Sequence, residues 1–427
     1  MEENERADGV SGEPDAANTE RLAQKPAADG NTGGEERRGF RNIFLLGLSS
    51  LFADASTEMV YPLIPLYLVS AFGATPALVG VIEGIAESLA SLLKVVSGYL
   101  ADRYKRKKPL AIAGYAMSLV YKAALLVATS WVGILAARVI DRFGKGMRTA
   151  PRDSLVSENA AYARQGAAFG LHKALDMAGS ALGVAAAYGI MKATGGAVAY
   201  KNIFLLSMIP AVCGVVVLSF VRERREKRER RERLRLRAGW NALDARLKLF
   251  LLTAFLFNLG NSSNSFLLLR AYGAGYDAVS VILLYLAYNV TSSLLALPLG
   301  KLSDRIGRRN LLVVGYLTFS AVYLGFGLAK SGLTFALLFV LYGVYTAATS
   351  GVERALIARI APPEWKGATL GLHGMLTGIA LLPASVIAGL LWNGVSASAP
   401  FLFGAALAFL SAVSIALIFR GGGRAAD

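Results

Sequence analysis

The chain has 427 residues, of which 55% are hydrophobic, and its mean hydropathy is +0.48. These values exclude a soluble two-domain protein and indicate a membrane protein. The net charge of +16 arises from clusters of Lys and Arg that follow particular apolar stretches, a distribution that argues against nucleic-acid binding. Cys213 is the only cysteine, so an intramolecular disulfide is excluded.

In chain order, residues 1–38 come first, with ten acidic side chains and no apolar stretch, and they predict a disordered cytoplasmic tail. Apolar stretches of about 20 residues follow, each long enough to cross about 30 Å of hydrocarbon. They predict twelve transmembrane helices, at 42–68, 76–101, 109–129, 131–153, 166–191, 201–221, 246–270, 277–300, 310–329, 332–358, 367–392 and 399–420. The expected fold class is an all-α polytopic membrane protein. Its expected parts are a six-helix bundle at 39–221, a basic cytoplasmic linker at 222–245, a second six-helix bundle at 246–420 and a cytoplasmic tail at 421–427.

The loop charges predict the orientation in the membrane. Cations cluster after even-numbered spans, at 103–108, 222–237 and 305–309, whereas the opposite loops at 70–75 and 393–399 have none. Positively charged loops stay in the cytoplasm. Both termini are therefore expected inside, in a multi-pass protein of the cytoplasmic (inner) membrane.

An internal repeat relates the two halves of the chain. GYLADRYKRKKPLAIAGY at 98–115 aligns with GKLSDRIGRRNLLVVGY at 300–316, and at nearly the same shift His172 aligns with His373. The shared Gly-x-Leu-[Ala/Ser]-Asp-Arg pattern between the second and third spans, and again between the eighth and ninth, resembles the signature loop of the major facilitator superfamily. This resemblance covers residues 40–420 and implies two pseudo-symmetric six-helix bundles that work as a secondary active transporter, or permease, and not as an enzyme.

The resemblance also implies a conformational latch. In the family, the first aspartate of this loop contacts the eleventh helix and holds the outward-facing state. Carried over, Asp102 would meet the eleventh helix near Lys366, and Asp304 would meet the fifth helix near Arg164. The glycines of the motif are expected to let helices pack closely. The implied latch residues are Gly98, Asp102, Arg103, Gly300, Asp304, Arg305, Arg164 and Lys366.

Asp102→Asn is expected to weaken this latch, because the amide lacks the negative charge that a helix N-terminus attracts. The expected result is slower transport and a shift towards the inward-facing state, measured by vesicle transport and by cysteine accessibility. Asp8→Asn, in the N-terminal tail, is the control. Unchanged transport and an unchanged balance of states in Asp102→Asn would show that the latch is absent.

Comparison of the two halves reveals charges that the fold does not require. At the repeat shift, Glu83 aligns with Tyr285, and Arg142 aligns with Gly343. A charge at the membrane centre costs a few kcal/mol, so such residues usually serve a function. Glu83 and Glu87 lie at depths similar to those of Arg138 and Arg142, and are available as their partners. A buried carboxylate beside arginine stays ionised, whereas one without a partner can carry a proton.

Three interpretations of these charges remain open. Arg142 and Lys145 contact an anionic substrate while carboxylates exchange protons, or the charges form a pre-paired structural network, or the carboxylates bind a cationic solute with the arginines as counter-charge. The predicted substrate-binding residues are Arg142, Lys145, Arg138, Asp141, Asp54, Asn258, Asn261, Asn264, Tyr345, Tyr285 and Asn289. The predicted proton-coupling residues are Asp54, Glu58, Glu83, Glu87, His172 and Asp176. For Arg138 a structural role is an equally open alternative, and for His172 the matching His373 in the otherwise neutral half favours a structural role.

Other motifs limit the chemistry. FGKG at 143–146 lacks the first glycine and the hydroxyl of a P-loop, so Gly144 and Gly146 are expected to permit close helix packing instead. Two histidines and one cysteine predict no metal cluster, and no cofactor is expected.

The expected function is proton-coupled efflux of an anionic or amphiphilic small molecule by antiport, driven by a proton or other ion gradient. The expected partners are the solute and membrane lipids, with no nucleic acid and no obligate protein partner. The rival is a membrane sensor that binds a ligand without transporting it.

Overall fold

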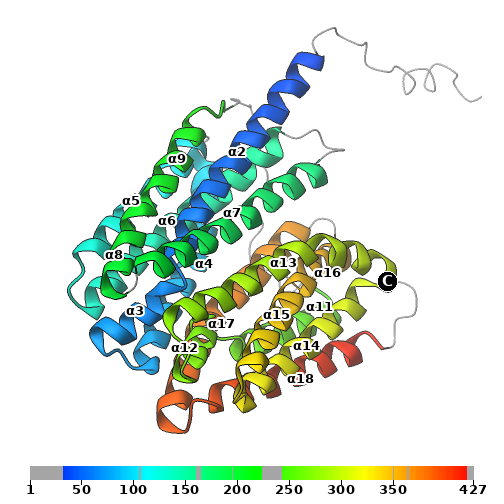
Figure 1. Cartoon of the computed structure of the whole chain (residues 1–427). Coiled ribbons are helices and arrows are strands. Elements are labelled where there is room, and N and C mark those ends of the chain that lie inside the picture. Colours follow the sequence, from blue (N-terminus) through cyan, green and yellow to red (C-terminus); the bar gives the residue numbers. More distant parts are fainter. Residues whose placement is uncertain are drawn as a thin grey trace, which may run out of the picture.

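The computed structural model describes residues 32–104, 107–159, 165–194, 196–223, 243–349, 351–362 and 365–420. The N-terminal half contains α2 (Thr32–Val60), α3 (Leu63–Phe72), α4 (Pro76–Tyr104), α5 (Lys107–Val127), α6 (Trp131–Asn159), α7 (Gln165–Thr194), α8 (Gly196–Leu206) and α9 (Met208–Ser219). The C-terminal half contains α11 (Ala245–Gly260), α12 (Ser265–Gly273), α13 (Ala278–Ile306), α14 (Arg308–Leu328), α15 (Gly332–Thr349), α16 (Val352–Ile360), α17 (Lys366–Gly394) and α18 (Ala399–Ile418). Figure 1 shows each half as a separate bundle of helices, which confirms the predicted all-α fold.

The described residues include ten helical segments that are long and apolar enough to cross a membrane. The fourth predicted span is not among them because α6 carries many charged side chains along its length. The seventh is not among them because it is divided into α11 and α12. With these two, the helices account for the twelve predicted crossings.

Several spans predicted as continuous are divided between two helices, among them the first (α2 and α3), the sixth (α8 and α9) and the seventh (α11 and α12). The seventh stops at Gly260 and resumes at Ser265, because the side chains of 261–264 compete with the helix for backbone hydrogen bonds. The Ser263 hydroxyl, for example, accepts a bond from the backbone N–H of Ser265 at 3.3 Å. The first span is interrupted at Pro62, which has no N–H to donate.

The boundary of the acidic tail also differs from the prediction. Helix α2 begins at Thr32, so residues 32–38 are helical and not disordered. The run EERR at 35–38 consists of good helix formers, which explains the extension. The rest of the tail, most of the basic linker (224–242) and residues 421–427 lie outside the described residues.

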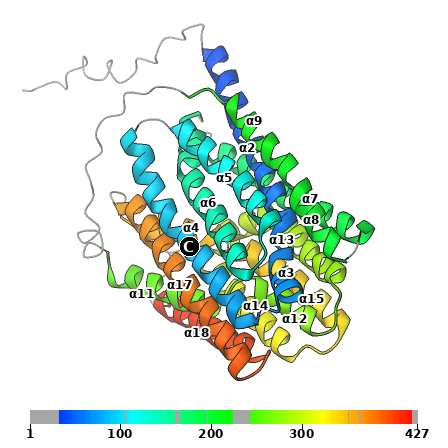
Figure 2. The ribbon, with the colours of Figure 1, turned by 90° about the vertical axis from the view of Figure 1, so that its left-hand side faces the viewer.

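The two bundles touch mainly at one end. We call the end where α2 and α11 begin the basic end. Away from it, the Ser88 hydroxyl donates to the backbone oxygen of Gly378 at 2.9 Å, and α4 lies so close to α17 that a Cβ at Gly389 would be 2.7 Å from the Cα of Ala77. Figure 2 shows these two helices side by side. In Figure 1 the bundles meet near α3 and α12 and diverge towards the basic end.

Glycines mark where helices pack closely. A Cβ at Gly144 would approach the backbone oxygen of Gly114 to 2.7 Å, and one at Gly146 would approach the backbone oxygen of Ala90 to 3.0 Å, so the predicted packing role of both is confirmed. For Gly300 the prediction is wrong in this conformation, since a Cβ there would meet open space. Gly300 lies near the C-terminal end of α13, where the two bundles diverge.

Candidate functional site

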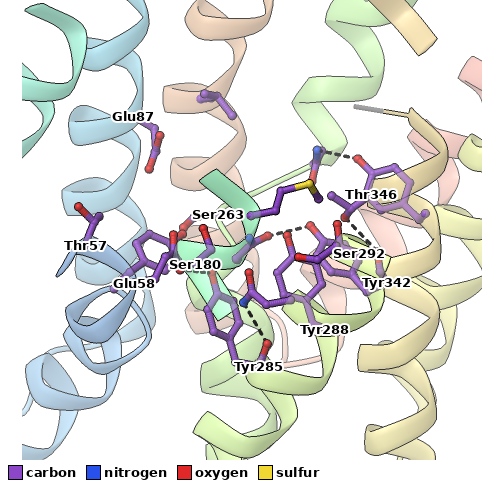
Figure 3. A pocket seen from close by; sticks show the side chains of 18 of the residues that line it. Thr57, Glu58, Glu87, Ser180, Ser263, Tyr285, Tyr288, Ser292, Tyr342 and Thr346 are labelled. Atoms are coloured by element: carbon purple, nitrogen blue, oxygen red, sulfur yellow. Dashed lines mark hydrogen bonds between the residues drawn. The ribbon is translucent and has the colours of Figure 1, made fainter. Parts of the chain in front are cut away.

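A pocket of about 430 Å³ lies between the two bundles. Its N-terminal wall comes from α2, α4, α6 and α7, and its C-terminal wall from the α11–α12 break, α13, α15 and α17. Figure 3 shows Thr57 and Glu58 on one side of the space, with Ser292 and Tyr342 on the other. The interrupted seventh span is tolerated because its non-helical backbone lines a cavity and not lipid.

Nine predicted residues line this pocket: Arg142, Lys145, Glu58, Glu87, Asn261, Asn264, Tyr285, Asn289 and Tyr345. Seven do not: Arg138, Asp141, Asp54, Asn258, Glu83, His172 and Asp176. The prediction missed lining residues that include Tyr61, Lys173, Tyr288 and Tyr342. A tyrosine near a span end is usually an interfacial anchor, so composition alone gave Tyr61 no functional signal.

In the N-terminal wall and behind it, oppositely charged side chains are paired with one another. Arg138 donates to Glu83, and both side chains are 1% exposed. Arg142 pairs with Glu87 at 3.0 Å between a guanidinium nitrogen and a carboxylate oxygen. One carboxylate oxygen of Asp141 lies 3.6 Å from a nitrogen of each arginine. The two arginines therefore share three carboxylates.

Lys122 is a further member of this network that the sequence analysis missed. It is fully buried, and its ammonium donates to the Ser118 hydroxyl at 2.6 Å. It lies close enough to Asp141 for electrostatic interaction, so it contacts the same network from α5. The sequence feature that could have identified Lys122 is its position inside an apolar span, where the aligned residue of the other half is the uncharged Tyr323.

Nearer the basic end, further charges are paired inside the N-terminal bundle. Arg148 lies 3.7 Å from Asp54 and stacks over the ring of Tyr115 at 4.5 Å. Arg152 lies 3.8 Å from Asp176, which also pairs with Lys173 at 3.5 Å.

The two histidines occupy comparable places in the two bundles. His172 and His373 are both buried. In the C-terminal bundle, a ring nitrogen of His373 lies 3.3 Å from a carboxylate oxygen of Glu353, and Glu353 accepts a hydrogen bond from the Tyr316 hydroxyl at 2.7 Å. Because both histidines lie outside the pocket wall, the arrangement favours a structural role for each.

Two charged groups in the pocket wall stand apart from these pairs. Within the described ranges, neither Lys145 nor Glu58 has an ion-pair partner within 4 Å. Lys145 is exposed in the pocket. Glu58 accepts a hydrogen bond of 3.2 Å from the Tyr285 hydroxyl, which belongs to the other bundle. The pocket therefore presents one ammonium and one carboxyl group that form no ion pair within 4 Å, although the two lie close enough to each other for electrostatic interaction.

The C-terminal wall contributes uncharged side chains. The ring centroids of Tyr285, Tyr288 and Tyr342 follow one another at 5.3 and 5.2 Å. Asn261 donates to the Tyr345 hydroxyl at 3.2 Å, and Asn264 accepts from the Tyr342 hydroxyl at 2.7 Å. The two walls thus differ as the repeat comparison predicts, with charge on one side and neutral polar groups on the other.

The implied latch residues lie at the basic end. Asp102 and Arg103 fall in α4, in the same helix as Gly98, and Lys366 begins α17. Arg164 lies outside the described residues, as do the latch contacts of Asp102. Asp304 lies 3.4 Å from Arg308 in its own loop, next to Arg305. The latch therefore remains a prediction of the resemblance.

Comparison with known proteins identifies the family. The model of the Major Facilitator Superfamily matches residues 46–288 and 250–425. The chain belongs to the Major Facilitator Superfamily. An MFS-type transporter of Methanocaldococcus jannaschii is 32% identical over 90% of this chain and 96% of its own length. Membership of this family means that the chain is a membrane transporter of small molecules and not an enzyme.

More distant MFS proteins are similar over most of the chain. A Lactococcus lactis protein named multi-drug resistance efflux pump PmrA homolog is 24% identical over 76% of this MFS chain and 81% of its own length. The crystal structure of the nucleoside transporter NupG superposes with a TM-score of 0.71 at 12% identity, covering 89% of this chain and 100% of that one. The structural likeness supports the fold alone.

Proposed function

We propose that this MFS protein is a proton-coupled secondary transporter of a small anion. The observation that carries the proposal is the pairing pattern. The buried arginines are neutralised by carboxylates of their own bundle, whereas the ammonium of Lys145 faces the pocket without an ion-pair partner in the described part of the chain. A solute anion at Lys145 gains a charge-assisted hydrogen bond without breaking an existing pair.

Glu58 is the proposed proton carrier. It lines the same pocket, close enough to Lys145 for electrostatic interaction, and its hydrogen bond to Tyr285 joins the two bundles. Because both bundles contribute to one site between them, rocking of one against the other would expose the site to each side in turn. The proposed orientation has the basic end in the cytoplasm of the inner membrane.

The sign of the coupling follows from electrostatics. An ionised Glu58 repels an anion bound nearby, and a proton on Glu58 removes that repulsion. Anion binding therefore draws a proton onto the protein, and the proton favours the anion by the same factor. Anion and proton are thus expected to travel together. This proposal therefore differs from the antiport expected from the sequence, because antiport requires that the solute and the proton compete for binding.

Lys145→Ala is expected to weaken anion binding by about 1.5–3 kcal/mol, which is roughly 10- to 150-fold, because it removes the charge that holds the anion. Titration calorimetry on the purified protein measures the change. Lys201→Ala, an exposed lysine on α8, is the matched control and should leave affinity unchanged. Parental anion affinity in Lys145→Ala would contradict the proposal.

A second candidate is proton-exchanging efflux of a cationic drug. It is favoured by the name of the Lactococcus lactis relative and by the presence of Glu58 and Glu87 in the pocket wall. A cation would compete with the proton for Glu58, so its binding would release a proton. Uptake of protons with an anion, or release of protons with a cation, distinguishes the two candidates. Accumulation in sealed vesicles separates both from a sensor that only binds.

A further inference from the structure

The pocket wall is unusually polar for a site that binds a lipophilic drug. Among its lining residues only Met177 and Leu381 have aliphatic side chains, and the remaining ones carry a hydroxyl, an amide or a charge. Drug-sized lipophilic ligands are held mainly by apolar walls. A lipophilic solute here would bury hydroxyls and amides without a hydrogen-bond partner, at a cost of about 1–3 kcal/mol each.

The amides of the C-terminal wall retain unused hydrogen-bonding capacity. An asparagine side chain offers two N–H donors and a carbonyl acceptor. Asn261 uses one N–H on Tyr345, and Asn289 uses one N–H on the backbone oxygen of Tyr285 at 3.0 Å. Asn289 also forms a side-chain hydrogen bond with Tyr285, so these bonds leave the carbonyl of each amide and the second N–H of Asn261 for a ligand. Paired donors and acceptors of this kind suit hydroxyl groups, which both donate and accept.

Tyrosine rings border the same space. Tyr61 lies 6.0 Å from Tyr285 between ring centroids, and the rings of Tyr288 and Tyr342 continue the row. Figure 3 shows Tyr285, Tyr288 and Tyr342 together beside the cavity. Flat aromatic surfaces give apolar contact to the C–H groups of a saturated ring, while the neighbouring amides reach its hydroxyls.

The charge of the wall indicates how many negative charges the ligand carries. Arg142 is engaged by Glu87, and Lys173 is engaged by Asp176. Lys145 is the lining cation without an ion pair in the described ranges, so it matches one negative charge.

We infer that the transported solute is a monoanion with several hydroxyl groups on a saturated ring, the class of the sugar acids. The inference rests on the proposed function and specifies it: the carboxylate lies at Lys145 on α6, and the hydroxyls are bound by Asn261 and Asn289 on the facing wall. Tyrosine rings hold the C–H surface of the ring. The lipophilic drugs handled by a multidrug pump do not fit this wall.

Thermal stability and titration of the full-length purified protein with four probes test the inference. D-glucuronate carries the ring, the hydroxyls and one charge. Cyclohexanecarboxylate keeps ring and charge without hydroxyls, D-glucose keeps hydroxyls without charge, and tetraphenylphosphonium is a lipophilic cation. The expected result is stabilisation by D-glucuronate, with binding at least about tenfold tighter than that of cyclohexanecarboxylate or D-glucose, because several hydrogen bonds of about 1 kcal/mol each distinguish them.

Matched variants locate the hydroxyl contacts. Asn289→Ala is expected to reduce the advantage of D-glucuronate over cyclohexanecarboxylate while leaving cyclohexanecarboxylate binding unchanged. Asn261→Ala should have the same effect. Asn261 lies at the break between α11 and α12, where a substitution can also disturb folding, whereas Asn289 lies within the regular helix α13, so Asn289→Ala tests the hydroxyl contact separately from folding of the break.

Three outcomes would overturn the inference. Equal binding of the two carboxylates would exclude hydroxyl recognition but leave the anion transporter standing. Stabilisation by tetraphenylphosphonium alone would contradict both. Absence of any stabilisation by D-glucuronate would exclude the sugar-acid class.

Discussion

Glu83→Ala is expected to lower the free energy of unfolding by about 3 kcal/mol, since the buried guanidinium of Arg138 loses its nearest carboxylate and keeps only Asp141, which it shares with Arg142. Both side chains are 1% exposed, so water cannot replace the lost carboxylate. Thermal unfolding and chemical denaturation in detergent measure the effect.

The matched control removes both charges together. In Glu83→Leu/Arg138→Met no unpaired charge remains, and apolar replacements of a buried ion pair are commonly neutral or stabilising. The double variant should therefore recover most of the lost stability and should still bind the anion. A Glu83→Ala protein as stable as the parent would show that this buried pair does not contribute to the fold.

Glu58→Gln is expected to abolish proton-driven accumulation of the anion while retaining exchange of labelled for unlabelled anion. The amide occupies the same space as a protonated carboxyl group but carries no proton across the membrane. Vesicles with an imposed pH gradient measure accumulation, and vesicles preloaded with anion measure exchange.

Tyr285→Phe serves as the companion variant for Glu58. It removes the hydrogen bond of 3.2 Å between the bundles but keeps the carboxyl group, so coupling should persist with an altered rate. Undiminished accumulation by Glu58→Gln would exclude Glu58 as the proton carrier and would direct attention to Glu87.

Much of the fold is predictable because membrane crossing imposes length and apolarity on each helix. The repeat then assigns the two halves, and their comparison identifies the N-terminal charges as dispensable for the fold. The depths of Glu83 and Glu87 correctly indicate partners for Arg138 and Arg142. What the sequence does not show is that these arginines are already paired with carboxylates of their own bundle, because pairing depends on side-chain directions on the two facing helices α4 and α6.

The C-terminal wall is harder to predict. Tyr288 and Tyr342 resemble core or interfacial tyrosines in sequence, and only the arrangement of α13 and α15 places them beside one cavity. The break at 261–264 is a signal that hydropathy averages conceal, since two asparagines and two serines interrupt the helix where the pocket lies. Lys122 was missed for a related reason: a single charged residue changes the mean hydropathy of an apolar span only slightly.

The most direct test is the count of protons taken up when the anion binds. Titrating weakly buffered, purified protein with D-glucuronate from neutral to alkaline pH should show uptake approaching about one proton per bound anion where the free carboxyl group is ionised. Glu58→Gln should bind the anion without proton uptake, and Lys145→Ala should need roughly 10- to 150-fold more anion for the same uptake. Proton release on binding, or parental uptake in Glu58→Gln, would contradict the assignment of Lys145 and Glu58 to solute and proton.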